Sequence, residues 1–275
     1  MIRSASTVSL VAELSGGPWV YRDPLEISIP RAKKVGFDGI ELFIASAAEL
    51  NSGLLGRLLG NYNLELSAIG TGAGKVLHNL TLTSTDENVR VRAHSFIREI
   101  IRLAGDFGAP AIIGSMQGAV SSDTDRSQAL AWLAESLEDL AGLAGSYDQP
   151  LLFEPLNRYE TDIFNRLGDA AAFIGKLDAS NILLVADLFH MNIEEASIPQ
   201  ALRSARELLG YVHFADSNRR AVGMGHTAID EIAETLRDIS YSGYLSAEVF
   251  ALPDPDSAAL QTIKSFNAHF RARST

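Results

Sequence analysis

The sequence predicts an α/β protein with a single (β/α)₈ barrel that spans residues 1–275. Short apolar or β-branched segments recur about eight times, and segments with helical spacing lie between them. This alternation continues to the C-terminus without a linker rich in proline or glycine, which favours one domain. An open doubly wound sheet is the structural alternative, but the length and the unbroken rhythm are more typical of a barrel.

The expected strands are short runs rich in aliphatic, β-branched and aromatic residues. In chain order they are Thr7–Glu13, Gly39–Phe43, Glu65–Gly70, Ala111–Gly114, Leu151–Glu154, Ile182–Ala186, Tyr211–Phe214 and Tyr244–Val249.

Two of the intervening segments have especially clear helical spacing, with apolar residues every three or four positions. These residues are Val89, Ala93, Phe96, Ile100 and Ala104 in one segment and Leu130, Leu133, Leu137, Leu140 and Ala144 in the other. Side-chain oxygens at positions 84–86 and 122–124 can accept hydrogen bonds from the free N–H groups at the two helix starts. Residues 251–256 are expected to form a loop before a last helix.

Composition excludes several classes of protein. The chain has 23 Lys and Arg against 34 Asp and Glu, so its net charge of -11 disfavours binding to nucleic acid or anionic membranes. The absence of cysteine excludes disulfides and thiolate metal ligands, and it is compatible with a reducing compartment. With no apolar stretch suited to a signal peptide or a membrane span, we expect a cytoplasmic protein.

Polar residues stand at the ends of four consecutive expected strands. They are Glu154, Asp187, His213 and Glu248, separated by 33, 26 and 35 residues. Each separation corresponds to one strand and helix, so all four side chains are expected on one rim of the barrel, where barrel enzymes have their active sites. Three converging carboxylates repel one another unless a cation lies between them. Oxygen ligands with one imidazole suit Mn²⁺, Mg²⁺ or Co²⁺, with Zn²⁺ as an alternative.

The loops that follow these strands carry further candidates for substrate contact. Glu160 follows the fifth strand, His190 comes three residues after Asp187, and Arg219 follows His213. The glycine-rich segment 70–75, which ends in Lys75, has two interpretations: a contact for an anionic substrate group or a plain loop. Trp19 and Phe43 could likewise form an apolar wall beside a sugar or serve only in packing.

Four segments together resemble a known family. They are residues 153–160 (Phe-Glu-Pro-Leu-Asn-Arg-Tyr-Glu), 187–192 (Asp-Leu-Phe-His-Met-Asn), 211–219 (Tyr-Val-His-Phe-Ala-Asp-Ser-Asn-Arg) and 247–248 (Ala-Glu). They resemble the xylose-isomerase-like TIM barrels, the sugar-phosphate isomerase/epimerase superfamily, and within it the ketose 3-epimerases that act on tagatose and psicose. Segments 35–41 and 239–244 extend the resemblance over nearly the whole chain, although only the C-terminal half is specific.

The resemblance implies a role for each of these residues. Glu154, Asp187, His213 and Glu248 would hold one divalent metal ion, Mn²⁺ or Mg²⁺ in the first place. Glu154 and Glu248 would also be the catalytic acid and base, and Glu160, His190 and Arg219 would bind the substrate. It further implies a small-molecule sugar or sugar-acid substrate and a homo-oligomer.

The chemistry implied is proton transfer through a metal-stabilised cis-enediolate of a keto-sugar or sugar phosphate. Return of the proton gives an epimer or an isomer, whereas loss of CO₂ or water from a related keto-sugar acid or keto-polyol would make the protein a decarboxylase or dehydratase. Remote alternatives are an apurinic endonuclease, which needs more histidines and a basic surface, and a non-catalytic sugar-binding barrel.

Overall fold

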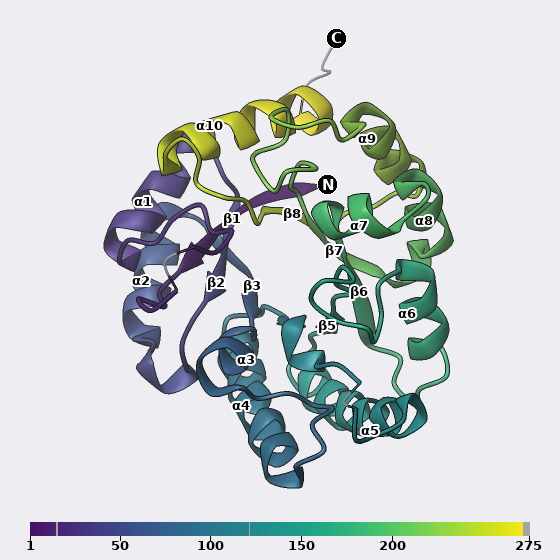
Figure 1. Ribbon diagram of the computed structural model, residues 1–275. Coiled ribbons are helices and arrows are strands. Elements are labelled where there is room, and N and C mark those ends of the chain that lie inside the picture. Colours follow the sequence, from purple (N-terminus) through teal and green to yellow (C-terminus); the bar gives the residue numbers. More distant parts are fainter. Residues whose placement is uncertain (15, 121, 272–275) are drawn as a thin grey trace.

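The computed structural model describes residues 1–14, 16–120 and 122–271. Eight parallel strands form a closed barrel in which each strand pairs with the next and the last pairs with the first, so the predicted fold class is confirmed (Figure 1). The strands are β1 (Arg3–Ser9), β2 (Gly39–Phe43), β3 (Glu65–Gly70), β4 (Ala111–Ile113), β5 (Leu151–Phe153), β6 (Ile182–Asp187), β7 (Leu209–His213) and β8 (Tyr244–Ala247).

Helices surround the barrel as an outer layer (Figure 1). They are α1 (Leu25–Val35), α2 (Ser52–Tyr62), α3 (Ala73–His78), α4 (Glu87–Asp106), α5 (Arg126–Gly145), α6 (Leu167–Ile174), α7 (Leu188–Glu194), α8 (Ile198–Ser204), α9 (Ile229–Asp238) and α10 (Pro255–Phe266). Short 3₁₀ turns cover Ala47–Glu49, Ser115–Gln117 and Arg206–Leu208, and a π-helical turn covers Asn267–Arg271. Among the described residues, no helix is both long and apolar enough to cross a membrane.

The two helices predicted from apolar spacing are α4 and α5. As expected, α4 starts directly after the polar segment 84–86, and the Asp86 side chain caps it by accepting a hydrogen bond from the Asn88 N–H at 2.8 Å. The start of α5 differs from the prediction, because Asp125 caps it instead of residues 122–124. The Asp125 carboxylate is adjacent to the first turn and accepts from the Gln128 N–H at 2.8 Å.

The first strand was predicted too late in the chain, at Thr7–Glu13 instead of Arg3–Ser9. The reason is that β1 is rich in small hydroxyl residues, which lack the apolar signal of a strand. Two of these buried hydroxyls have partners on other segments: Ser4 Oγ donates to the Asp38 carboxylate at 3.0 Å, and Thr7 Oγ1 donates to the Ala247 carbonyl at 2.7 Å. The other strands agree with the prediction to within two residues at either end.

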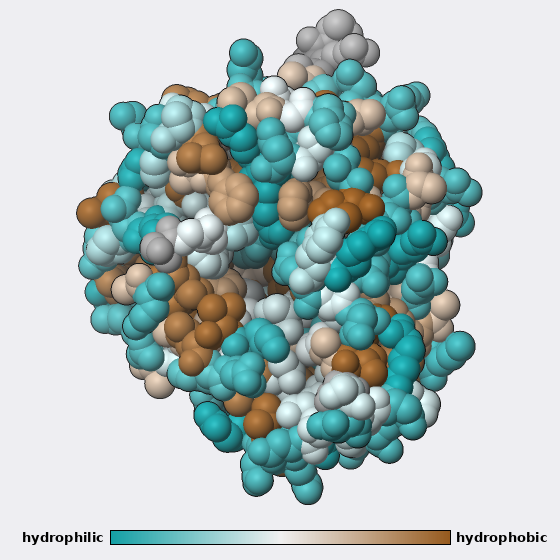
Figure 2. Space-filling model, in the orientation of Figure 1, coloured by the Kyte–Doolittle hydropathy of each residue, from teal (hydrophilic) through white to brown (hydrophobic). Residues whose placement is uncertain are grey.

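Two apolar clusters stabilise the barrel. The larger one lies between the strands and the helices, as Leu42, Ile97 and Leu137 illustrate. The smaller one has one residue from each of seven strands: Ala5, Ala68, Ile112, Leu152, Val185, Tyr211 and Tyr244. These residues fill the interior of the barrel. The space-filling view shows a hollow near the centre of the face that it presents (Figure 2). A filled interior leaves the rim at the carboxyl ends of the strands as the place for a site.

Candidate active site

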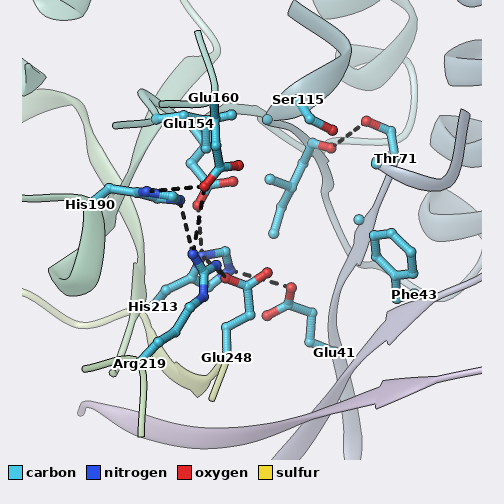
Figure 3. A pocket seen from close by; sticks show the side chains of 15 residues that line it. Glu41, Phe43, Thr71, Ser115, Glu154, Glu160, His190, His213, Arg219 and Glu248 are labelled. Carbon is cyan, nitrogen blue, oxygen red and sulfur yellow. Dashed lines mark hydrogen bonds and ion pairs between the residues drawn. The ribbon is translucent and has the colours of Figure 1, made fainter. Parts of the chain in front are cut away.

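Four polar side chains meet at the carboxyl ends of β5 to β8, and Figure 3 shows three of them, Glu154, His213 and Glu248. Glu154 follows β5 directly, Asp187 and His213 are the last residues of β6 and β7, and Glu248 follows β8. Each offers one ligand atom, and these four atoms lie within 4.8 Å of one another. Asp187 and His213 are also register partners in the pairing of β6 with β7. The barrel therefore brings together the four residues predicted from the strand ends.

The His213 Nδ1 atom lies at the centre of this cluster. It is 2.9 Å from Glu154 Oε1 and 3.4 Å from Asp187 Oδ2. Glu248 Oε2 is 3.5 Å away from the same nitrogen. Glu154, Asp187 and His213 are at most 6% exposed, and the Glu248 side chain is 17% exposed. Three carboxylates and one imidazole at this spacing fit a hard divalent cation such as Mn²⁺ or Mg²⁺.

Burial and charge shift the pKa values of the cluster in different directions. Burial raises the pKa of Glu248 to about 8, although Arg219 and His213 oppose the increase. Burial would also raise the pKa of Asp187, but His190 and Arg219 outweigh it and hold that pKa below its ordinary value. For His213, burial disfavours the charged form, yet the surrounding carboxylates, Glu248 first, raise its pKa well above the ordinary value.

These shifts predict a pH dependence of metal binding. A carboxylate must lose its proton to ligate a cation, so a cation that binds this cluster below about pH 8 would have to displace a proton from Glu248. We expect Mn²⁺ affinity to increase from pH 6 toward pH 8, by up to about tenfold per pH unit for each proton displaced. Calorimetric titration at several pH values measures this slope. The Glu248→Gln variant should have a shallower slope, and an affinity that is constant over this range would contradict the prediction.

The three predicted substrate-binding residues surround the same cluster. Arg219 forms an ion pair with Glu248 and lies 3.5 Å from Asp187 Oδ2. His190 Nε2 is 3.4 Å from Arg219 Nη1, and Glu160 Oε1 is 3.8 Å from His190 Nδ1. All three side chains line one cavity of about 90 Å³ together with Glu154, His213 and Glu248 (Figure 3). Their contact with substrate stays a prediction.

Asn157 is a residue whose role the sequence did not reveal. Its backbone N–H and its Nδ2 lie 3.2 and 2.7 Å from His190 Nδ1. With two N–H donors facing it, Nδ1 acts as an acceptor, and the ring proton is therefore on Nε2, the nitrogen nearest Arg219. The neighbouring Arg158 points away from the site, because its guanidinium binds both oxygens of Glu194 on α7 at 2.9 Å.

The opposite wall of the cavity comes from β2, β3 and β4 and the loops after them. It consists of Glu41, Phe43, Gly70, Thr71, Gly72, Ile112, Gly114 and Ser115, with Leu156 from the loop after β5. Phe43 forms part of the predicted apolar wall, and Trp19 supports it at a ring-centroid distance of 4.8 Å. Lys75 is not among the residues that line this cavity. The glycine-rich segment therefore contributes Gly70, Thr71 and Gly72 to the wall, but not its lysine.

Gly114 supports Glu154 by having no side chain. A Cβ atom at this position would lie 2.6 Å from Glu154 Oε2, too close for any real contact. Gly114→Ala should therefore displace the Glu154 carboxylate and lower both Mn²⁺ affinity and kcat. Gly142→Ala is the matched control, because a Cβ there meets no atom within 4 Å. Calorimetric titration and steady-state kinetics of the two variants measure the Mn²⁺ affinity and kcat. A Gly114→Ala variant with wild-type values of both would refute the steric role.

Fold and site together define a class of protein: a (β/α)₈ barrel with a carboxylate-rich candidate site for a metal ion at the carboxyl ends of its strands. The comparisons with known proteins agree with this class. The chain belongs to the xylose isomerase-like TIM barrel family, whose model matches residues 29–269.

Named relatives are sugar epimerases. The chain is 31% identical over 228 residues to the D-psicose 3-epimerase of Agrobacterium fabrum (strain C58 / ATCC 33970). The aligned region covers 81% of this chain and 78% of that enzyme. It is 38% identical over 128 residues to the 3-dehydro-D-guloside 4-epimerase of Escherichia coli (strain K12), covering 46% and 47% of the two chains. A crystal structure of D-allulose 3-epimerase from Methylomonas sp. superposes with a TM-score of 0.80 at 23% identity, over 98% of this chain and 99% of that one, and supports the fold alone.

Proposed function

We propose that this protein is a divalent-metal-dependent sugar isomerase/epimerase that acts on a keto-sugar or sugar phosphate by removing and returning a proton beside the carbonyl group. The observation that carries the proposal is the convergence of four candidate ligand atoms within 4.8 Å beside a cavity of about 90 Å³. Two of the ligand residues, Glu154 and Glu248, are carboxylates that can also exchange protons. The epimerase relatives support the reaction type and the keto-sugar substrate.

Glu154, Asp187, His213 and Glu248 would hold the cation, and we propose Mn²⁺ or Mg²⁺ for it. When bound, a divalent cation supplies Lewis-acid chemistry, which acidifies the C–H bond next to the carbonyl and offsets the negative charge that proton removal leaves on the oxygens.

Glu154 and Glu248 would move the proton. One carboxylate oxygen removes the proton from the carbon beside the ketone, and the other carboxyl group delivers a proton to the opposite face of that carbon, which inverts its configuration. Delivery to the former carbonyl carbon instead moves the ketone to the next position, and an aldose forms only if the proton is taken from the terminal carbon and delivered to the former carbonyl carbon.

The remaining residues of the cavity would bind and orient the sugar. Arg219 presents N–H donors beside Glu248, and His190 presents its Nε2–H next to them. Glu160, whose side chain is 43% exposed, can accept hydrogen bonds from sugar hydroxyls at the cavity mouth. Phe43 and Leu156 provide an apolar wall that excludes water from the reacting carbon.

Incubation with a panel of ketoses, keto-sugar acids and their phosphates in D₂O tests the proposal. Deuterium bound to the carbon next to a carbonyl, in a product with the same number of carbons, would support isomerisation or epimerisation and identify the exchanged position. Loss of one carbon as CO₂ would establish the decarboxylase alternative, and loss of water the dehydratase. Sugar binding without any turnover would instead indicate a binding protein.

Replacement of the substrate-binding residues should leave the metal in place. We expect His190→Ala and Arg219→Ala to lower kcat/KM through weaker substrate binding, with bound Mn²⁺ near the wild-type amount. Metal analysis of each purified variant, beside its steady-state kinetics, separates the two effects. Loss of the metal in both variants would instead place these residues among those that hold the cation.

Two further features are proposals from the sequence and the family resemblance. We propose that the enzyme is a homo-oligomer, which light scattering after size-exclusion chromatography measures directly. Its cytoplasmic location stays a prediction, and fractionation of cells that express the protein tests it.

A further inference from the structure

Glu41 is a buried carboxylate to which the proposed reaction gives no role. It lies in the middle of β2 and is 5% exposed. Its side chain reaches toward His213 across the barrel (Figure 3). The four residues whose ligand atoms cluster within 4.8 Å do not include it. Because a buried carboxylate seldom persists without partners, its two oxygen atoms indicate what it does.

Each oxygen of Glu41 has its own partner on β7. Oε1 lies 3.3 Å from His213 Nε2, and Oε2 accepts a hydrogen bond from the Tyr211 hydroxyl at 3.1 Å. Tyr211 also contacts Ser67 Oγ on β3, at 2.7 Å. Burial raises the pKa of Tyr211 well above its ordinary value, so this hydroxyl keeps its proton and remains a donor. The Glu41 carboxylate therefore has two partners on β7, and one of them, Tyr211, also contacts β3.

His213 needs a partner for its second nitrogen. Its Nδ1 faces the carboxylates of Glu154 and Asp187, and a nitrogen that ligates a cation must present a lone pair. The ring proton must then be on Nε2. This atom is buried and has no partner in ideal hydrogen-bond geometry among the described residues, and the carboxylate that faces it belongs to Glu41. A small rotation of the ring or of the carboxylate completes the Nε2–H to Oε1 bond.

We infer that Glu41 is a positioning residue for the metal centre: it accepts the Nε2–H of His213, fixes that tautomer and directs Nδ1 toward the cation. The inference rests on the proposed metal site. A carboxylate behind a ligating histidine orients the ring and increases its basicity, and loss of such a partner typically lowers metal affinity or activity about 10- to 100-fold. Glu41 acts through His213 and is given no contact with the reacting carbon.

Two conservative variants separate this role from simple charge attraction. Glu41→Gln removes the charge but keeps an oxygen atom at the same place to accept from His213. Its NH₂ group can donate a hydrogen bond to the Tyr211 hydroxyl, and this hydroxyl can then donate to Ser67 Oγ. Glu41→Asp keeps the charge but withdraws the acceptor by one methylene group. Positioning predicts that Glu41→Asp loses about 10- to 100-fold in Mn²⁺ affinity, whereas Glu41→Gln loses at most a few fold. Attraction by charge alone predicts the reverse order.

The measurement is calorimetric titration of the metal-free variants with Mn²⁺, together with the electron paramagnetic resonance spectrum of the bound ion. Neither readout depends on turnover. Ser6→Ala is the control, since Ser6 is another fully buried polar residue of the barrel, and it should bind Mn²⁺ like the wild type. Thermal unfolding of the metal-free proteins shows whether each variant folds. Should Glu41→Asp not fold, Glu41→Met replaces it, because it removes the acceptor and keeps the length of the side chain.

The outcomes distinguish failure of this inference from failure of the proposed function. Weaker Mn²⁺ binding and an altered spectrum in Glu41→Asp, with Glu41→Gln closer to the wild type, support the positioning role. Unchanged affinity in both variants overturns it, and so does a greater loss in Glu41→Gln than in Glu41→Asp. If Glu41→Met is used instead, an affinity equal to that of Glu41→Gln overturns it. A wild-type protein that binds no Mn²⁺ would refute the metal centre itself.

Discussion

Glu248→Gln is expected to lower kcat by about 10²- to 10⁴-fold, the usual contribution of a general acid or base. Glutamine keeps the size of the side chain and one oxygen atom, but it cannot accept or release the proton at the reacting carbon. The same argument applies to Glu154→Gln. Because both residues also belong to the ligand cluster, the rates must be measured at Mn²⁺ concentrations that saturate each variant.

Deuterium exchange makes the Glu248→Gln prediction sharper. If the two carboxyl groups act on opposite faces of the carbon, either single variant should lose epimerisation, while the remaining carboxylate can still exchange hydrogen on its own face for one of the two epimers. NMR in D₂O follows both reactions. Glu138→Gln is a suitable control, because this exposed carboxylate accepts from the Asp178 N–H far from the site. Full kcat in Glu154→Gln or Glu248→Gln would remove that residue from the acid/base pair.

Removal of divalent metal with EDTA is expected to reduce turnover to the background rate, and Mn²⁺ or Mg²⁺ should restore it. The metal should also stabilise the fold, because it binds a site that exists only in the folded chain. At a free Mn²⁺ concentration 100 times its Kd, the free energy of unfolding should increase by about 2.7 kcal/mol. The physical cause is that a bound cation would offset the mutual repulsion of the buried carboxylates, which His213, Arg219 and His190 offset in its absence.

Thermal unfolding with and without Mn²⁺ tests this expectation. Asp187→Asn removes one buried carboxylate of the candidate metal site and should abolish most of the increase in Tm. Asp139→Asn is the control: this residue pairs with Arg98 at 2.5 Å between the outer helices α4 and α5, so the variant should respond to Mn²⁺ like the wild type. Full activity after exhaustive chelation, with no change of Tm on adding Mn²⁺, would contradict the metal-dependent mechanism.

The fold and most of the candidate site could be predicted from the sequence because their signals are local. In a parallel barrel, each apolar run that ends in a polar residue places that residue at the same rim. The strand ends at Glu154, Asp187, His213 and Glu248 therefore lie together once the barrel closes. Apolar spacing identified α4 and α5 for a similar reason, since the residues of one helix face are only three or four positions apart in the chain.

Contacts between distant segments were decided only by the tertiary structure. Strand β1 was predicted too late because its buried hydroxyls find partners on other segments, such as Asp38 and Ala247. Arg158, close to the site in sequence, turns away because Glu194 on α7 offers two oxygens.

Glu41 is the clearest case of what the sequence alone leaves undecided. It lies inside β2 and not at its end, and its partners Tyr211 and His213 are about 170 residues away in the chain. The sequence determined the barrel and the four residues at its rim, because periodicity and strand ends are properties of neighbouring residues. Closure of the barrel decided which buried side chain supports which ligand, because that depends on strands that meet only in three dimensions.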